Sequence, residues 1–220
     1  MISPMRAIVV LLACFVALTT PSARSQPAIG THGAVATVDR IASQAGLDAM
    51  KKGGNAVDAA VAAALTLGVV NGYNSGIGGG CFILIRRSNG EVLCIDGRET
   101  APAAATRDMY LRDGKPDPAS SQIGALAGGT PGALAAYALA LKSAGKLPLK
   151  EHLLAAAQIA GDGFPIDKRY AAVLRESRGE LARFPATAAV FLESDGAPYR
   201  EGEILRQPDL ARTYRAVAEN

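Results

Sequence analysis

Charged side chains collect at the end of an apolar stretch, where residues 91–95 lead into Asp96, Arg98 and Glu99. The planar guanidinium group of an arginine carries a rigid fork of N–H donors, which holds a carboxylate through two parallel hydrogen bonds. Arg98 is therefore the first candidate to bind a substrate carboxylate. An internal ion pair with Asp96 or Glu99 explains the same residues equally well, because ion pairs are common at strand ends. The residues alone leave both interpretations open.

A glycine-rich run at residues 71–80 precedes this cluster. Glycine loops that bind phosphate lead from a strand into the N-terminus of a helix, whose free N–H groups face the anion. Here the order is reversed, because a helical pattern comes before the run and a strand pattern follows it. We therefore expect Gly78, Gly79 and Gly80 to permit close backbone approach and to shape a site beside Arg98 rather than to bind a nucleotide.

Two cysteines, Cys81 and Cys94, lie on two predicted strands joined by the Asn89-Gly90 turn signal. A two-residue loop at that turn pairs Cys94 with Ile85 and Cys81 with Arg98. The cysteines are then four residues out of register, about 13 Å apart, which exceeds the reach of ~7 Å for a disulfide. The pattern predicts two buried free thiols.

The two histidines offer no metal site. His152 lies on a predicted helix without Cys, Asp or His at ligand spacing, and we expect it on the solvated surface. His32 also stands alone in the sequence. Zinc patterns, a Walker loop and a Gly-x-Ser-x-Gly elbow are absent from the sequence. We therefore predict no metal and no cofactor.

The periodicity of apolar residues predicts a mixed α/β protein. The stretch 56–70 is apolar almost all round and should be buried on every side. The first strand is apolar on both faces, which is typical of a central strand covered from both sides. The expected helices cover residues 38–52, 56–70, 131–145, 148–162, 167–174, 181–191 with a break at Pro185, and 209 onward, and the expected strands cover residues 81–87 and 91–97.

The amino-acid composition excludes several classes of protein. The chain has 220 residues, 49% hydrophobic and 20% charged, with 3 Cys and a net charge of +3. That is too apolar for a disordered chain and too poor in cysteine for a disulfide scaffold. The absence of a Lys/Arg-rich run argues against nucleic-acid binding.

The first 25 residues predict export. Arg6 precedes an apolar run at 7–18, and Ala23-Arg24-Ser25 offers small residues for cleavage. Twelve helical residues reach about 18 Å, short of the ~30 Å hydrocarbon core, so a cleaved signal peptide is favoured over an uncleaved anchor. We expect a periplasmic or secreted protein without stable membrane insertion after signal removal.

Five motifs in fixed order resemble those of the gamma-glutamyltransferase family. They are KGGNAVDAAVA at 52–62, SGIGGG at 75–80, DGRETAP at 96–102, GTPG at 129–132 and DGFP at 162–165. The resemblance implies the four-layer αββα sandwich of N-terminal-nucleophile hydrolases, incomplete in this chain. It assigns residues 26–220 to the N-terminal part of the large subunit, and implies that Arg98 binds the α-carboxylate of a gamma-glutamyl group.

The same resemblance implies a self-cleaving precursor whose small subunit begins with the nucleophilic Thr. That Thr, in its Thr-Thr-His context, does not occur in these 220 residues, so we expect no catalytic residue here and no activity of this part alone. The implied partners are glutathione or another gamma-glutamyl substrate and the small subunit. Two alternatives stay open: an acylase of the same fold acting on glutaryl-cephalosporin or poly-gamma-glutamate substrates, and a truncated, non-catalytic remnant or interaction module.

Overall fold

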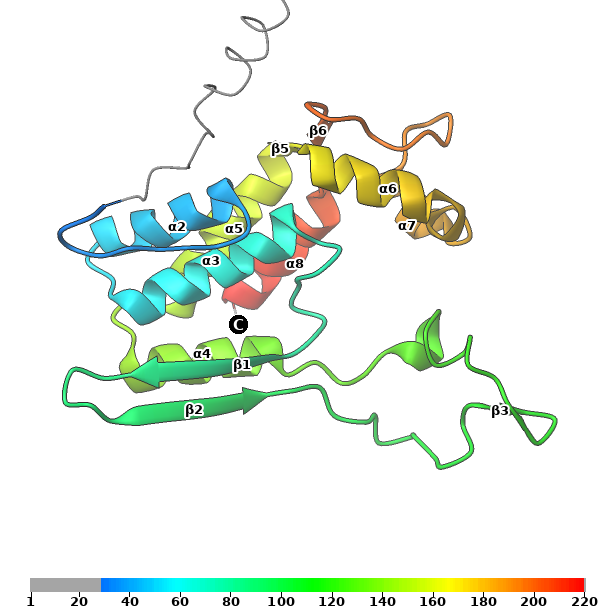
Figure 1. Cartoon of the computed structure of the whole chain (residues 1–220), viewed down its shortest axis with the longest axis horizontal. Helices are drawn as coiled ribbons and strands as arrows, with labels where there is room; N and C mark the ends of the chain where they lie inside the picture. Colours follow the sequence, from blue (N-terminus) through cyan, green and yellow to red (C-terminus); the bar gives the residue numbers. More distant parts are fainter. Residues whose placement is uncertain (1–28, 220) are drawn as a thin grey trace, which may run out of the picture. The chain divides into compact units, whose positions relative to one another are not determined.

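The computed structural model describes residues 29–219, so the predicted signal peptide lies outside the described residues. The described chain divides after Ala34, and Val35–Asn220 form one compact unit. This unit contains both helices and strands, as the periodicity predicts (Figure 1). No helix of the described chain is both long enough and apolar enough to span a bilayer.

Two helices joined by a Gly-Gly turn begin the unit. Helix α2 (Arg40–Lys51) starts where the Asp39 side chain accepts hydrogen bonds from two backbone N–H groups. Helix α3 (Ala56–Val70) starts at a capping box, in which the side chains of Asn55 and Asp58 each accept from the other end of the first turn. Both helices match their predicted ranges within two residues. Helix α3 is buried along most of its length, although Ala56 and Ala60 are exposed.

A β-hairpin follows α3. Strand β1 (Cys81–Arg86) pairs antiparallel with β2 (Val92–Gly97), and Leu84 lies opposite Cys94. The predicted pairing of Cys94 with Ile85 is therefore wrong by one residue. Gly90 has φ = 90° and its N–H donates to the Arg87 carbonyl, so the loop has three residues instead of two. A glycine in the left-handed region commonly closes such a loop.

One face of this hairpin is covered and the other is not. Helix α4 (Ala133–Ala144) contacts both strands and also α3 (Figure 1). Ile85 of β1 and Ile95 of β2 are buried against α4. On the opposite face Phe82, Leu84 and Val92 are 62%, 73% and 58% exposed. We predicted that β1 is covered on both faces, but the described residues cover only one of them.

The remaining elements build the helical layer. Helix α5 (Leu149–Asp162) contacts both α3 and α8 (Pro208–Glu219). The core they enclose includes Tyr214 and Leu153, both fully buried. The elements are α5 (Leu149–Asp162), β5 (Phe164–Pro165), α6 (Lys168–Leu181), α7 (Pro185–Phe191), β6 (Ile204–Leu205) and α8 (Pro208–Glu219). Pro185 begins α7 instead of interrupting a longer helix, because proline lacks the N–H group that an interior position must donate.

The C-terminal helices support the end of α3, from which the glycine run departs. The Tyr214 hydroxyl donates to the Leu65 carbonyl at 3.2 Å, and Gln207 Nε2 donates to the Val69 carbonyl at 2.8 Å. Both contacts are buried, and the one to Val69 satisfies a carbonyl in the last turn of α3, where helical acceptors lack intrahelical partners. The glycine run therefore starts from a fixed point.

The long connection from β2 to α4 carries only short elements. These are β3 (Leu111–Arg112), β4 (Lys115–Pro116) and the 3₁₀ turn η1 (Ala125–Ala127). Its two ends come together, because Thr100 and Thr130 exchange backbone hydrogen bonds of 3.2 and 2.9 Å. The segment that contains Arg98 is consequently held next to the segment that enters α4.

Candidate functional site

The site is built on close backbone contacts around the end of β2. A Cβ added to Gly80 would lie 2.7 Å from the Gly97 carbonyl oxygen, and a Cβ on Gly97 would lie 2.5 Å from the Ala136 side chain. Gly132 likewise lies against the carbonyl oxygens of Gly97 and Arg98. Any side chain at these glycines would push the backbones apart. Three segments thus meet at the position from which Arg98 projects.

Hydrogen bonds fix the glycine run to the start of α4. The Gly79 carbonyl accepts from the N–H groups of Gly132 and Ala133, each at 3.1 Å. These N–H groups belong to the first turn of α4, where helical donors lack intrahelical partners. The run and the helix therefore satisfy each other's backbone groups.

Arg98 emerges from this base beside two carboxylates. Its backbone N–H donates to Asp96 Oδ1 at 2.9 Å, and its side-chain Nε lies 3.3 Å from Glu99 Oε2. The Arg98 side chain is 71% exposed. Among residues 29–219 the guanidinium forms an ion pair with Glu99 alone, and the contact is given through Nε. The internal ion pair and an open guanidinium fork therefore coexist.

Two small cavities adjoin this pair. Gly80, Cys81, Phe82, Arg98 and Glu99 line one of about 270 Å³. Another of about 520 Å³ lies under the glycine run and also reaches Glu99. The structure thus brings Arg98 together with Gly80, as the sequence predicts, despite the shifted register.

The three glycines predicted to shape the site, Gly78, Gly79 and Gly80, differ in how closely other atoms pack against them. A Cβ on Gly79 would lie 3.3 Å from Glu99 Oε1, and one on Gly80 would lie 2.7 Å from Glu99 Oε2. A Cβ on Gly78 would meet no atom within 4 Å. Only Gly79 and Gly80 are therefore closely packed against the charged pair.

The cysteines are free, as predicted, but they are not both buried. Cys94 is exposed on the uncovered face of the hairpin, and Cys81 is half-buried. The shifted register turns Cys94 away from α4. Burial raises the pKa of the Cys81 thiol, and burial together with the nearby Cys81 raises the pKa of Tyr137 to about 12. Neither group is therefore activated as a nucleophile at neutral pH.

The prediction that His152 is a surface residue is wrong. Its side chain is 3% exposed, and its Nε2 lies 3.5 Å from Asp58 Oδ1. Burial lowers the pKa of His152, while the neighbouring Asp58 raises it in part. The sequence reasoning missed this pair because the two residues are 94 positions apart.

Asp58 is the centre of this buried cluster. Its carboxylate accepts from the backbone N–H groups of Asn55 at 2.7 Å, Leu147 at 2.8 Å and Lys146 at 3.0 Å. Burial by itself raises the pKa of Asp58, but the backbone hydrogen bonds and His152 together hold it below its ordinary value. The carboxylate ties the start of α3 to the connection between α4 and α5.

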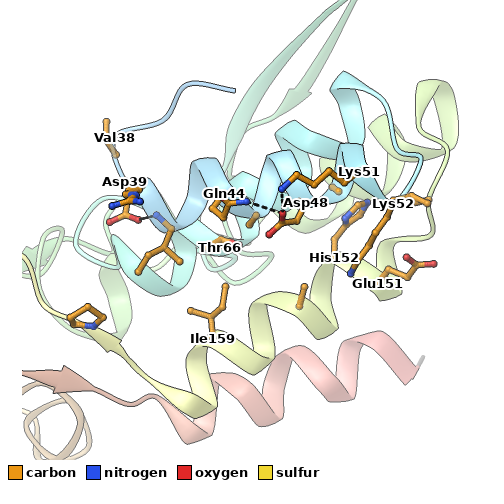
Figure 2. Close-up of a pocket in the computed structure, with 18 of the residues that line it drawn as sticks. Val38, Asp39, Gln44, Asp48, Lys51, Lys52, Thr66, Glu151, His152 and Ile159 are labelled. Atoms are coloured by element: carbon orange, nitrogen blue, oxygen red, sulfur yellow. Dashed lines mark hydrogen bonds and ion pairs between the residues drawn. The ribbon is translucent and has the colours of Figure 1, made fainter. Parts of the chain in front are cut away.

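A larger cavity of about 1020 Å³ adjoins this cluster between α2 and α5, and His152 and Thr66 of α3 are among its lining residues (Figure 2). Asp48 on its rim pairs with Lys51 at 3.1 Å and accepts from Gln44 at 2.8 Å. In the part of the chain that the structure describes, no three His, Cys, Asp or Glu side chains come together as metal ligands. We place the candidate site at Arg98, whose exposed side chain lines one small cavity and whose partner Glu99 lines both.

Two further residues belong to the site and were not singled out by sequence reasoning. Glu99 entered that reasoning only as an ion-pair partner, and Gly132 only as part of a motif. The close approach of Gly132 to the strand end requires two segments 35 positions apart to meet, so only the tertiary structure reveals it.

Residues 42–220 match the sequence model of the gamma-glutamyltranspeptidase family. The glutathione hydrolase proenzyme of Escherichia coli (strain K12) is 42% identical over 195 residues, which are 88% of this chain and 34% of that protein. The chain spans about a third of the length of the curated relatives it matches.

Solved structures agree with this match. The gamma-glutamyltranspeptidase of Helicobacter pylori superimposes with a TM-score of 0.85 at 34% identity, covering 88% of this chain and 56% of that chain. The cephalosporin acylase from Bacillus halodurans gives a TM-score of 0.71 at 28% identity, covering 89% and 38%. Both superpositions confirm the predicted fold class.

Proposed function

Because this chain belongs to the gamma-glutamyltranspeptidase family, we propose that it forms the substrate-anchoring part of an exported enzyme. The enzyme cleaves gamma-glutamyl amide bonds, in glutathione and its conjugates, and transfers the gamma-glutamyl group to water or an amino acid. The observation that carries this proposal is the Arg98 side chain, which projects from a base of closely packed glycines and is 71% exposed.

Arg98 binds the substrate and takes no part in bond cleavage. Its Nη groups hold the α-carboxylate of the gamma-glutamyl group in a two-pronged contact. The nucleophile is the N-terminal Thr of the small subunit from the same precursor. Its α-amine accepts the hydroxyl proton, the oxygen attacks the gamma-carbonyl, the amine leaves with a proton, and water or an amino acid cleaves the resulting ester.

The uncovered face of the hairpin supports the proposed partner. A two-stranded hairpin is marginally stable by itself, and here its outer face presents Phe82, Leu84 and Val92 to solvent. A second sheet from the remainder of the precursor would bury this face in the αββα arrangement that the family implies. Arg98 follows the end of β2 and would then lie at the edge of the joint between the two sheets.

Export rests on the first 25 residues, so the mature protein is periplasmic or secreted. The mass of the protein recovered from the periplasm or the medium checks this. The expected N-terminus lies close to Gln26. Recovery of an unprocessed N-terminus would contradict the proposal.

The central test is the substitution Arg98→Ala in the complete gene product, with a gamma-glutamyl anilide as substrate. Losing one partner of a charge-assisted pair costs about 2 kcal/mol or more, which corresponds to a rise in KM of about thirtyfold or more. Self-cleavage of the precursor should continue. The matched control is Arg87→Ala, a half-buried arginine at the far end of the hairpin that pairs with Glu91 at 3.2 Å and donates to the Ser143 carbonyl at 3.3 Å. An unchanged KM for Arg98→Ala refutes the role.

The acylase alternative gains support from the structural similarity to a cephalosporin acylase. A glutaryl anilide differs from the gamma-glutamyl anilide only by the missing α-ammonium group, and both present a carboxylate to Arg98. The ratio of kcat/KM for the two anilides therefore separates the two functions. We expect the gamma-glutamyl anilide to be preferred, and a preference for the glutaryl anilide would assign the protein to the acylases.

A further inference from the structure

We propose that Glu99 is a positioning residue for the substrate carboxylate: it holds the Arg98 side chain through Nε, so that the two terminal nitrogens face the substrate. This inference rests on the proposed role of Arg98 as the carboxylate anchor. It assigns a function to a carboxylate that lies against both Arg98 and the glycine run.

The contact geometry of Arg98 carries the first step. Glu99 Oε2 lies 3.3 Å from Arg98 Nε, and the guanidinium makes no other ion pair among residues 29–219. A guanidinium binds a carboxylate either through Nε and one Nη or through both Nη groups. Because the Glu99 carboxylate lies on the Nε side of the guanidinium, the outer edge with both Nη groups is the one that faces away from it and is left for a substrate.

The rigidity of the base carries the second step. The Arg98 backbone is fixed by its hydrogen bond to Asp96 Oδ1 and by the adjacent bridge between Thr100 and Thr130. The long Arg98 side chain, by contrast, is 71% exposed. An unrestrained arginine loses rotamer freedom when it binds a ligand. A contact that fixes Nε beforehand lowers this entropic cost of binding.

The glycine run provides the third step, because it leaves room for the Glu99 carboxylate. A Cβ on Gly80 would lie 2.7 Å from Glu99 Oε2, and a Cβ on Gly79 would lie 3.3 Å from Oε1. The two carboxylate oxygens are thus bounded by the glycine backbone on one side and by Arg98 on the other. The glycines and Glu99 together determine where the guanidinium sits.

The sign of one kinetic effect separates positioning from competition. If Glu99 positions Arg98, Glu99→Gln raises KM for the gamma-glutamyl anilide. If Glu99 instead competes with the substrate carboxylate for Arg98, the same change lowers KM, because a negative charge beside the anion is removed. Exposed ion pairs contribute modest energies, so we expect a rise of about three- to fivefold, with kcat changed less than twofold.

The experiment measures kcat and KM for the complete gene product and its Glu99→Gln and Glu99→Asp variants. Aspartate keeps the charge but is one methylene shorter, so it should restore KM in part. The matched control is Glu91→Gln, since Glu91 also forms an exposed ion pair with an arginine, Arg87, at the far end of the hairpin. Its KM should equal that of the wild type.

A double-mutant cycle shows whether Glu99 acts through Arg98. In an Arg98→Lys background the Nε edge no longer exists, so adding Glu99→Gln should not raise KM further. A lower or unchanged KM in the single variant, or an equal rise in both backgrounds, overturns the inference. A wild-type protein without gamma-glutamyl cleavage, or a normal KM in Arg98→Ala, instead overturns the proposed function. If Glu99→Gln accumulates poorly, Glu99→Asp should still give a smaller rise in KM with Arg98 present and no rise in the Arg98→Lys background.

Discussion

Replacing Asp58 with alanine tests whether one buried carboxylate holds two parts of the fold together. Asp58 is fully buried and accepts hydrogen bonds from the N–H groups of Asn55, Lys146 and Leu147. The first of these donors begins α3, and the other two lie in the turn between α4 and α5. Alanine leaves all three donors without their acceptor.

The structure sets the size of the effect. Each buried N–H group that loses its partner costs about 1–3 kcal/mol, and water recovers part of this at the turn. We therefore expect Asp58→Ala to lower the free energy of unfolding by about 3–5 kcal/mol, the range for breaking a buried charged network. The matched control is Asp48→Ala, because Asp48 is half-exposed and its pair with Lys51 should contribute less than about 1 kcal/mol.

Two measurements on the complete gene product check this prediction. Urea unfolding followed by far-UV circular dichroism gives the loss of stability. Hydrogen exchange of the amides of Lys146 and Leu147 reports the two donors directly, and their exchange should accelerate in Asp58→Ala but not in Asp48→Ala. Equal stability losses in the two variants, or unchanged exchange at both amides, would refute the reasoning.

Two further predictions concern the glycine run and the buried histidine. Gly80→Ala places a Cβ 2.7 Å from the Gly97 carbonyl oxygen and should lower the free energy of unfolding by about 1–3 kcal/mol. Gly78→Ala places a Cβ with no atom within 4 Å and should leave Tm unchanged. Equal Tm values for the two variants would contradict this account of the packing. Because burial holds the pKa of His152 below its ordinary value of 6.5, the unfolded state binds more protons below that pH and stability should fall as the pH drops. Urea unfolding at pH 7.5 and 5.5 should show a smaller drop in His152→Gln, and an equal drop in both proteins contradicts this assignment.

Local patterns identify much of the fold. Asn55 and Asp58, three residues apart, indicate the start of α3, and the structure places its first residue at Ala56 with both caps formed. The strands of the hairpin are predicted within one residue at each end. Its register is not, because the same Ser-Asn-Gly turn signal permits a two- or a three-residue loop, and the positive φ of Gly90 selects the longer one.

The environment of single side chains is less predictable. Helical spacing puts His152 on a helix, but it does not say that this face packs against Asp58. The alternation of β2 places Cys94 on one face, but the one-residue register shift makes that face the uncovered one. Both errors concern which faces of the helices and strands pack against each other. Residues close together in the sequence do not determine that packing.

The sequence by itself determined the order of the long helices and of the hairpin strands, because these follow from local periodicity and capping residues, but not the two-residue strands β3–β6. Its motifs also indicated the family, and the resemblance to that family selected Arg98 as the candidate anchor. Only the tertiary structure decided that Glu99 contacts both Arg98 and the glycine run, that Gly132 closes over the strand end, and that Asp58 is buried with His152. The physical reason is distance along the chain: the last two contacts join segments 35 and 94 positions apart, and a buried carboxylate–imidazole contact or a close backbone approach exists only once those segments have met.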